Sequence, residues 1–145
     1  MVFTDLKDLP VLLDEGGLDS DACLVVTDTN VAGHHGHALE SYLTEAGRHV
    51  RRIVIDPGET SKSFESYGRL LDRALEEPIT RRTTVLAFGG GVVGDLAGFA
   101  AATLLRGLPL VQVPTTLVAQ VDSAIGGKTG INHATGKNLI GSFYQ

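Results

Sequence analysis

The sequence predicts an α/β domain with a Rossmann-like parallel sheet flanked by helices, and three observations support this fold class. Short apolar runs alternate along the chain with segments of helical periodicity. A glycine-rich turn at residues 89–95, GGGVVGD, joins one apolar run to another. Polar, glycine or proline residues follow the apolar runs, and in a parallel sheet such positions meet at one edge, where ligands collect.

The first half of the chain is expected to contain two strands and three helices. The segment 22–28 reads ACLVVTD, an apolar run typical of a buried strand. Residues 61–77 form the clearest amphipathic helix, because apolar side chains recur there at helical spacing. In order, the expected elements are a weak helix at 6–13, the strand at 22–28, a helix at 34–47 ended by Gly47, a strand at 50–56 closed by Pro57 and Gly58, and the helix at 61–77.

The second half repeats the alternation. A strand at 84–88 leads into the glycine turn and a helix to Leu105, and a strand at 109–113 stops at Pro114 before a short helix at 116–125. Residues 126–138 are polar and rich in glycine, so we expect a loop there. A loop of that length in a compact domain is usually functional or mobile.

The glycine turn favours a phosphate ligand. Its glycines fit the G-x-G-x-x-G pattern, and glycine lets the backbone approach a ligand while the first amides of the next helix point into the turn. An ordinary Rossmann fold places an acid about 20 residues later. Here the next strand ends at Pro114 without one, and the acidic strand end is Asp28. Close packing is the alternative explanation for Gly94 and Gly98.

Composition excludes several classes of function. The chain has 145 residues and a formal net charge of −5, which suits one compact domain and argues against a nucleic-acid binder with a general positive field. The single cysteine, Cys23, indicates a reducing cytoplasm and no disulfide framework. Residues 1–10 do not resemble a signal peptide, and Arg106 interrupts the longest apolar run, so we expect no membrane span. The histidines at 34, 35 and 37 lack metal-ligand spacing.

Charged residues near the predicted turns leave two readings open. Glu59 and Lys62 could form a local ion pair or contact a ligand, and Asp95 could complement a helix dipole or contact a ligand. Residues 126–129, GGKT, are not a P-loop, because Asp122 stands where that motif needs glycine. Lysines in the following segment suit an anionic substrate.

Six blocks of sequence together resemble the 3-dehydroquinate synthase family of the sugar-phosphate cyclase superfamily. The blocks are long, ordered and correctly spaced, and they extend over most of residues 22–145. They read PGETSK at 57–62, GGGVVGD at 89–95, RG at 106–107, PTTL at 114–117, QVDSAIGGKTG at 120–130 and GKNLIG at 136–141.

The resemblance implies NAD as cofactor and assigns the site residues. Asp28 and Asn30 would contact the adenosine ribose, and Glu59 and Lys62 would line the same cofactor. Further cofactor contacts would come from Gly90, Gly91, Val92, Asp95, Thr115, Thr116, Lys128 and Lys137. The residues implied to act on the substrate are Asp122, Lys128, Asn138 and Arg106, the last across a dimer interface.

The family reaction converts 3-deoxy-D-arabino-heptulosonate 7-phosphate, a phosphorylated sugar acid, to 3-dehydroquinate and phosphate in the shikimate pathway. The resemblance implies a divalent metal, zinc or cobalt, whose ligands belong to a helical C-terminal domain and not to this chain. We therefore expect residues 1–145 to form a single NAD-binding domain that is inactive alone, although the full-length enzyme is a homodimer. The missing domain would leave Leu139, Ile140 and Phe143 exposed.

Three other functions compete with this one. The chain could derive from a cyclase that acts on sedoheptulose 7-phosphate or glucose 6-phosphate. A metal-dependent glycerol or alcohol dehydrogenase shares the overall fold, although such enzymes tend to carry a lysine soon after the acid of the glycine turn, where Asp95 is followed by LAG. The third is a nucleotide-binding module without catalytic activity.

Overall fold

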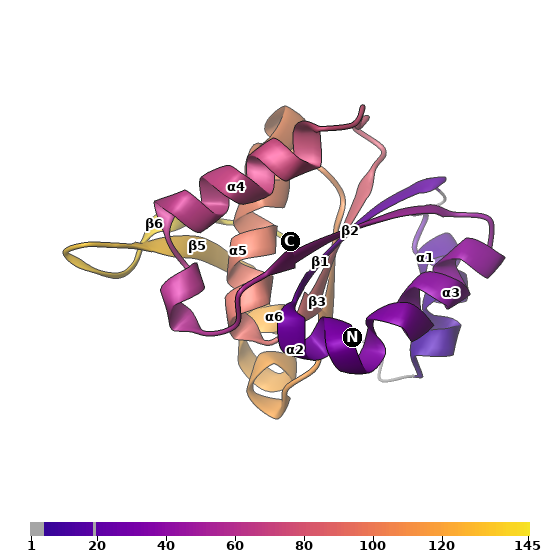
Figure 1. The fold of residues 1–145 in the computed structure, drawn as a ribbon, viewed down its shortest axis with the longest axis horizontal. Coiled ribbons are helices and arrows are strands. Elements are labelled where there is room, and N and C mark those ends of the chain that lie inside the picture. The colour runs from indigo at the N-terminus through magenta and orange to yellow at the C-terminus, as the bar shows by residue number, and fades with distance from the viewer. Residues whose placement is uncertain (1–4, 19) are drawn as a thin grey trace.

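A computed structural model describes residues 5–18 and 20–145 of the chain (Figure 1). Its main feature is a four-stranded parallel sheet with the strand order β2-β1-β3-β4, which confirms the predicted α/β class. A two-stranded antiparallel hairpin pairs β5 with β6. The strands are β1 (Ala22–Asp28), β2 (His49–Ile55), β3 (Thr84–Gly89), β4 (Leu110–Pro114), β5 (Lys128–His133) and β6 (Gly136–Phe143).

Helices cover both faces of the parallel sheet (Figure 1). On one face Leu39 of α3 packs in a cluster with Val25 of β1, and on the other Leu70 of α4 packs with Val26. Successive residues of the central strand therefore serve opposite cores. The helices are α1 (Leu9–Glu15), α2 (Thr29–Val31), α3 (His37–Glu45), α4 (Phe64–Leu75), α5 (Gly91–Thr103) and α6 (Ala124–Gly126), with 3-10 turns at Leu6–Asp8, Glu59–Ser61 and Leu104–Arg106 and π-helical turns at Ala32–Gly36 and Ala119–Ser123.

Side-chain caps explain where two helices differ from the prediction. The helix expected from residue 34 starts earlier, because the Asp28 carboxylate accepts hydrogen bonds from the amides of Asn30 and Val31 (2.9 and 3.0 Å). The helix expected from residue 61 starts at Phe64, after Ser63 accepts a bond from the amide of Ser66. The strand at 22–28 has the predicted bounds, β2 and β4 are shifted by one residue, and β3 begins as predicted but ends one residue later.

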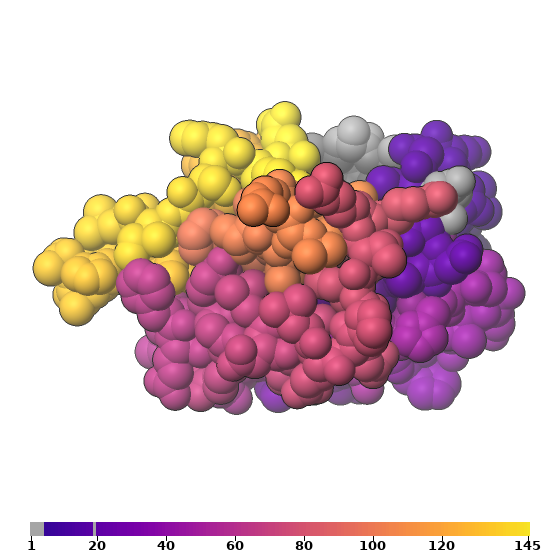
Figure 2. Space-filling model, turned by 90° about the horizontal axis from the view of Figure 1, so that it is seen from above, coloured from indigo at the N-terminus to yellow at the C-terminus, as the bar shows by residue number. Residues whose placement is uncertain are grey.

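The prediction of a loop at residues 126–138 is wrong. Most of that segment belongs to the β5–β6 hairpin, whose tip projects from the body of the molecule (Figures 1 and 2). Gly130, one of the glycines that suggested a loop, serves cross-strand packing, because it pairs with Gly141 and a Cβ on it would lie 2.5 Å from the Ile140 carbonyl oxygen. Gly127, by contrast, ends α6 with a φ of 62°. Ile131 is fully buried and anchors the base of the hairpin in the core.

Close packing accounts for the two glycines inside helix α5. A Cβ on Gly94 would lie 2.8 Å from the side-chain oxygen of Gln112, and a Cβ on Gly98 would strike the methyl group of Thr129. Glycine at position 98 therefore lets β5 lie directly on α5. This contact attaches the hairpin to the helix that follows the glycine turn.

Part of the expected apolar surface is present. Leu139 and Phe143 are 61% and 85% exposed, as predicted, but Ile140 is half-buried and packs against the main core, so the prediction for that residue is wrong. Across residues 5–18 and 20–145, every helix is too short or too polar to cross a bilayer. The expectation about a leader at residues 1–10 lies partly outside the described residues, which begin at residue 5.

The thiol of Cys23 is buried in β1 and 2% exposed. Burial raises the pKa of the Cys23 thiol, and the Arg48 guanidinium opposes that shift without cancelling it. The unfolded thiol therefore ionises at a lower pH than the folded one. The stability that this group contributes is complete below its ordinary pKa and is lost as the pH rises towards the folded pKa.

At mildly alkaline pH, we expect iodoacetamide to alkylate the Cys23 thiol of the folded chain about 100-fold more slowly than that of the chain in concentrated guanidinium chloride. Equal rates would show that the thiol is accessible.

Candidate functional site

The carboxyl ends of the four parallel strands lie at the same edge of the sheet, which we call the ligand edge. The register pairs Asp28 with Ile55 and Gly89 with Pro114, at the last residues of their strands. Asp28, the glycine turn and Thr115 are thereby brought to one edge although they are far apart in sequence. Open α/β sheets bind their ligands at this edge.

The glycine turn presents the amino end of α5 to the ligand edge. Gly90 precedes the helix, and the amide of Gly94 is the one that bonds back to the Gly90 carbonyl oxygen (3.0 Å). The amides of Gly91, Val92 and Val93 therefore have no acceptor within the helix. Together with the helix dipole they can bind a phosphate oxygen.

The segment that follows β4 forms a wall beside this turn. A Cβ on Gly90 would lie 3.4 Å from the Thr116 methyl group, and one on Gly91 would lie 3.4 Å from the Ser123 hydroxyl. The amide of Thr115 donates to the Gly89 carbonyl oxygen (3.0 Å), but its buried hydroxyl, like those of Thr27 and Thr84, has no hydrogen-bond partner among the described residues. Thr115 is the one of these three that directly follows a strand at the ligand edge, where a bound polar group can satisfy it.

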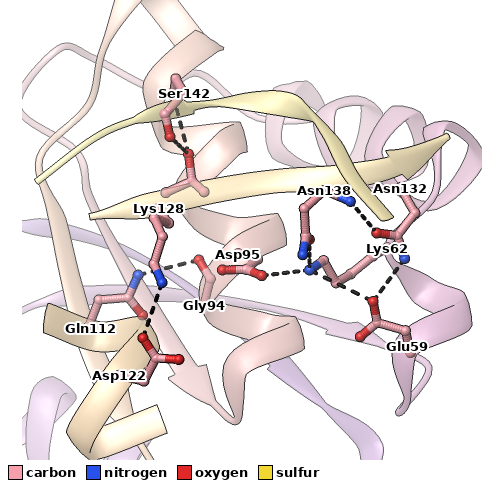
Figure 3. A network of polar contacts seen from close by, with 11 residues as sticks. Glu59, Lys62, Gly94, Asp95, Gln112, Asp122, Lys128, Asn132, Asn138 and Ser142 are labelled. Carbon is pink, nitrogen blue, oxygen red and sulfur yellow. Dashed lines mark hydrogen bonds and ion pairs between the residues drawn. The ribbon is translucent and has the colours of Figure 1, made fainter. Parts of the chain in front are cut away.

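Lys62 is a buried residue at the centre of a polar cluster beside the turn (Figure 3). Its side chain is 4% exposed, and its ammonium donates to the carboxylate of Asp95 (2.6 Å) and to the side-chain oxygen of Asn138. The Glu59 carboxylate is 3.8 Å from the same nitrogen. A buried ammonium needs such partners, and these come from α5, β6 and the 3-10 turn before α4. The local pair with Glu59 is therefore the weaker of the two carboxylate contacts.

Asn132 joins the same cluster, although the sequence indicated only a polar residue of the glycine-rich segment there and no site role. Its side-chain nitrogen donates to the Glu59 carboxylate (2.9 Å), and its side-chain oxygen accepts from the amide of Asn138 (2.8 Å). Its own amide donates to the Lys62 carbonyl oxygen (2.8 Å). Nothing in the sequence distinguishes Asn132 from the polar residues around it. We call Glu59, Lys62, Asp95, Asn132 and Asn138 the Lys62 cluster.

A second, exposed pair lies at the base of the hairpin (Figure 3). The ammonium of Lys128, at the start of β5, donates to the Asp122 carboxylate (3.1 Å), and the two side chains are 59% and 64% exposed. Lys137 is exposed beside Asn138 on β6. These side chains are accessible to a ligand that reaches the hairpin from solvent.

The predicted ribose contacts also lie at the ligand edge. Asp28 ends β1, and Asn30 follows it on the exposed surface of α2. The capping bonds use only one oxygen of the Asp28 carboxylate, Oδ1, which leaves Oδ2 out of the cap. Thr116 lies next to Thr115, and its hydroxyl oxygen accepts a bond from the amide of Ala119 (3.2 Å).

The structure does not bring Arg106 to these residues. Helix α5 begins at the ligand edge and has 13 residues, so its far end lies about 20 Å away at the opposite edge of the sheet. Arg106 follows that end, is exposed and has a left-handed backbone with φ of 66°. Among the described residues, no three histidine, cysteine, aspartate or glutamate side chains are placed to hold a metal ion.

The parallel sheet, the glycine turn at its ligand edge and the hairpin packed on α5 define an α/β domain of the class found in sugar-phosphate cyclases. The family model described as 3-dehydroquinate synthase N-terminal matches residues 52–145. The chain therefore belongs to the 3-dehydroquinate synthase family.

Curated relatives agree with this assignment. The chain is 60% identical over 143 residues to a 3-dehydroquinate synthase of Salinibacter ruber, an alignment that covers 99% of this chain and 39% of the relative. A 3-dehydroquinate synthase of Caulobacter vibrioides is 54% identical, with 94% and 39% covered. The chain thus spans about two fifths of the length of these relatives.

Solved structures of two other cyclases have the same fold. The 2-epi-5-epi-valiolone synthase of Streptomyces hygroscopicus, with NAD+ and Zn2+ bound, has a TM-score of 0.84 and 35% identity, and the alignment covers 99% of this chain and 39% of that one. A 2-deoxy-scyllo-inosose synthase, complexed with carbaglucose-6-phosphate, NAD+ and Co2+, has a TM-score of 0.80 and 34% identity, with 86% and 34% covered. A glycerol dehydrogenase of Schizosaccharomyces pombe, at 21% identity, shares the fold alone.

Proposed function

We propose that this chain is the NAD-binding part of a cytoplasmic 3-dehydroquinate synthase, which forms 3-dehydroquinate and phosphate from 3-deoxy-D-arabino-heptulosonate 7-phosphate in the shikimate pathway. The observation that carries the proposal is the amino end of α5, whose amides face the ligand edge beside the orphaned hydroxyl of Thr115. The 60% identity to the Salinibacter ruber relative favours this reaction over those of the two cyclases compared above, which are 34% and 35% identical.

The residues present fit a dinucleotide. The amides of Gly91 and Val92, which follow Gly90 at the turn, suit the diphosphate, because a helix terminus binds anions without a charged side chain. When bound, NAD supplies a reversible acceptor for hydride. The remaining proposed contacts divide into the ribose pair Asp28 and Asn30, the adenine-side pair Thr115 and Thr116, and the nicotinamide-side group Asp95, Lys128 and Lys137. Because the Lys62 ammonium contacts Asp95 and lies 3.8 Å from Glu59, we place Glu59 and Lys62 on the nicotinamide side as well.

The hairpin residues suit the substrate. Lys128 and Lys137 are exposed ammonium groups that can donate to phosphate or carboxylate oxygens. Asp122 can accept a hydrogen bond from a substrate hydroxyl, and the pair it forms with Lys128 orients both side chains. The side-chain oxygen of Asn138 accepts from Lys62, which leaves its side-chain nitrogen to donate to the substrate.

The proposed roles of Arg106 and of the metal both depend on parts of the enzyme other than this chain. Because Arg106 lies at the opposite edge of the sheet from Gly91, we propose that it reaches the substrate of a second subunit in a homodimer. We further propose that the ligands of the divalent metal belong to the part of the enzyme that this chain does not span, and that the chain alone does not turn over substrate.

Thermal unfolding with and without NAD tests the cofactor assignment. At a concentration 100 times its Kd, NAD should add about 2.7 kcal/mol to the free energy of unfolding. A Gly91→Asp variant should lose this gain, because its carboxylate repels the diphosphate while remaining compatible with the first turn of a helix. Gly68→Asp is the matched control, since position 68 of α4 has open space around it. No stabilisation of the original chain by NAD would refute the proposal.

A further inference from the structure

A bulge in the hairpin places Asn132 opposite Asn138. The cross-strand pairs are Ile131 with Ile140 and His133 with Gly136, so one residue of β5 faces three residues of β6. A bulge of this kind interrupts the ladder of hydrogen bonds and redirects side chains. The amide of Asn138 is satisfied by the side-chain oxygen of Asn132, at 2.8 Å, in place of a backbone carbonyl.

The bulge holds Asn138 in an unusual backbone conformation. Its φ is 55°, in the left-handed region that residues other than glycine seldom adopt. Such a conformation persists when the surroundings hold it in place, and it is common where a side chain must be aimed. Two contacts hold Asn138 here. Asn132 binds its backbone amide, and the Lys62 ammonium binds its side-chain oxygen.

The side-chain nitrogen of Asn132 binds Glu59. The carboxylate of Glu59 accepts from the Asn132 side-chain nitrogen at 2.9 Å and lies 3.8 Å from the Lys62 nitrogen. The Lys62 ammonium therefore keeps its closest contacts for Asp95 and Asn138. The backbone amide of Asn132 also binds the Lys62 carbonyl oxygen, which attaches the hairpin to the turn that carries Glu59.

We propose that Asn132 is a positioning residue, which sets the side chains of Glu59 and Asn138 for the nicotinamide half of the cofactor. The inference rests on the proposed function, since it takes NAD as the ligand of this edge. Asn132 does not itself contact the cofactor. It acts through Glu59 on the 3-10 turn and Asn138 on the hairpin, which its side-chain amide connects.

The test compares NAD with ADP-ribose, which has the same adenosine diphosphate but no nicotinamide. For an Asn132→Ala variant, we expect the Kd of NAD to rise about tenfold, as for the loss of one or two hydrogen bonds, and the Kd of ADP-ribose to change less than about twofold. Hydrogen exchange of the Asn138 amide, followed by NMR, should become faster by about tenfold or more. Equal weakening of both ligands, or an unchanged NAD affinity, would overturn the proposal.

Two further variants separate positioning from general loosening of the hairpin. Asn132→Asp keeps an acceptor for the Asn138 amide but places a second carboxylate against Glu59, so it should weaken NAD while exchange at Asn138 stays slow. Ser142→Ala removes a hydroxyl from the same hairpin, where it contacts the Thr129 hydroxyl at 3.2 Å, and should leave both affinities unchanged. If the unaltered chain binds NAD no more tightly than ADP-ribose, the positioning role alone fails. If it binds neither, the proposed function fails with it.

Discussion

Replacing Asp95 with asparagine is expected to lower the free energy of unfolding by about 3 kcal/mol, because it leaves the buried Lys62 ammonium without its closest carboxylate. Replacing Lys62 with methionine should cost less, about 2 kcal/mol, since the Asp95 carboxylate then stays at the amino end of α5, where the helix dipole favours it. Urea unfolding of both single variants and of the double variant gives the coupling between the two side chains. We expect that coupling to be about 1–3 kcal/mol.

The exposed pair on α4 is a matched control for burial. Arg69 and Glu65 lie 2.8 Å apart, close to the 2.6 Å of Lys62 and Asp95, but their side chains are 59% and 78% exposed. The cycle of Arg69→Met and Glu65→Gln should therefore give a coupling of only about 0.3–0.5 kcal/mol. Salt should abolish that coupling and leave the Lys62–Asp95 coupling largely intact. Similar couplings for the two pairs would show that the Lys62 cluster is as hydrated as the surface.

Replacing Gly98 with alanine is expected to destabilise the chain by about 1–3 kcal/mol, although alanine is ordinarily the better helix former. The added methyl group would meet the Thr129 side chain, whose β-branched form has little freedom to rotate away. The hairpin would have to move off α5. Denaturant unfolding should show a lower midpoint with an unchanged m-value.

The same substitution at Gly68 is expected to have the opposite effect on stability. This residue is inside α4, and no atom lies within 4 Å of the place that an added methyl group would take, so Gly68→Ala should stabilise the chain by about 0.5–1 kcal/mol. Thr129→Ala should partly rescue Gly98→Ala by removing the methyl group in the way. A stabilising Gly98→Ala variant would show that the hairpin is not held against α5.

Patterns of local sequence were enough to predict the sheet and its ligand edge. Apolar runs marked the strands, because a strand covered on both faces has few polar positions, and the residue after each run marked the edge. Asp28 and Gly90 could be assigned to this edge because Asp28 ends a strand and Gly90 directly follows one. The resemblance to a family added the identity of the ligand.

Contacts between distant segments could not be predicted in the same way. The pair of Glu59 with Lys62 is visible in sequence because the residues are three apart, whereas Asp95 is 33 positions from Lys62 and only the fold brings them together. The hairpin was mistaken for a loop because composition cannot tell a glycine that permits a turn from one that permits close packing. The helix predicted from the glycine turn to Leu105 already placed Arg106 away from the turn, and the structure agrees.

The charged side chains proposed for the site almost cancel one another. They belong to three lysines and four acidic residues. The lysines are Lys62, Lys128 and Lys137, and the acids are Asp28, Glu59, Asp95 and Asp122. This edge therefore lacks the surplus of positive side chains that attracts polyanions from a distance. Its selectivity for an anion must arise at short range, from peptide dipoles oriented before the ligand arrives.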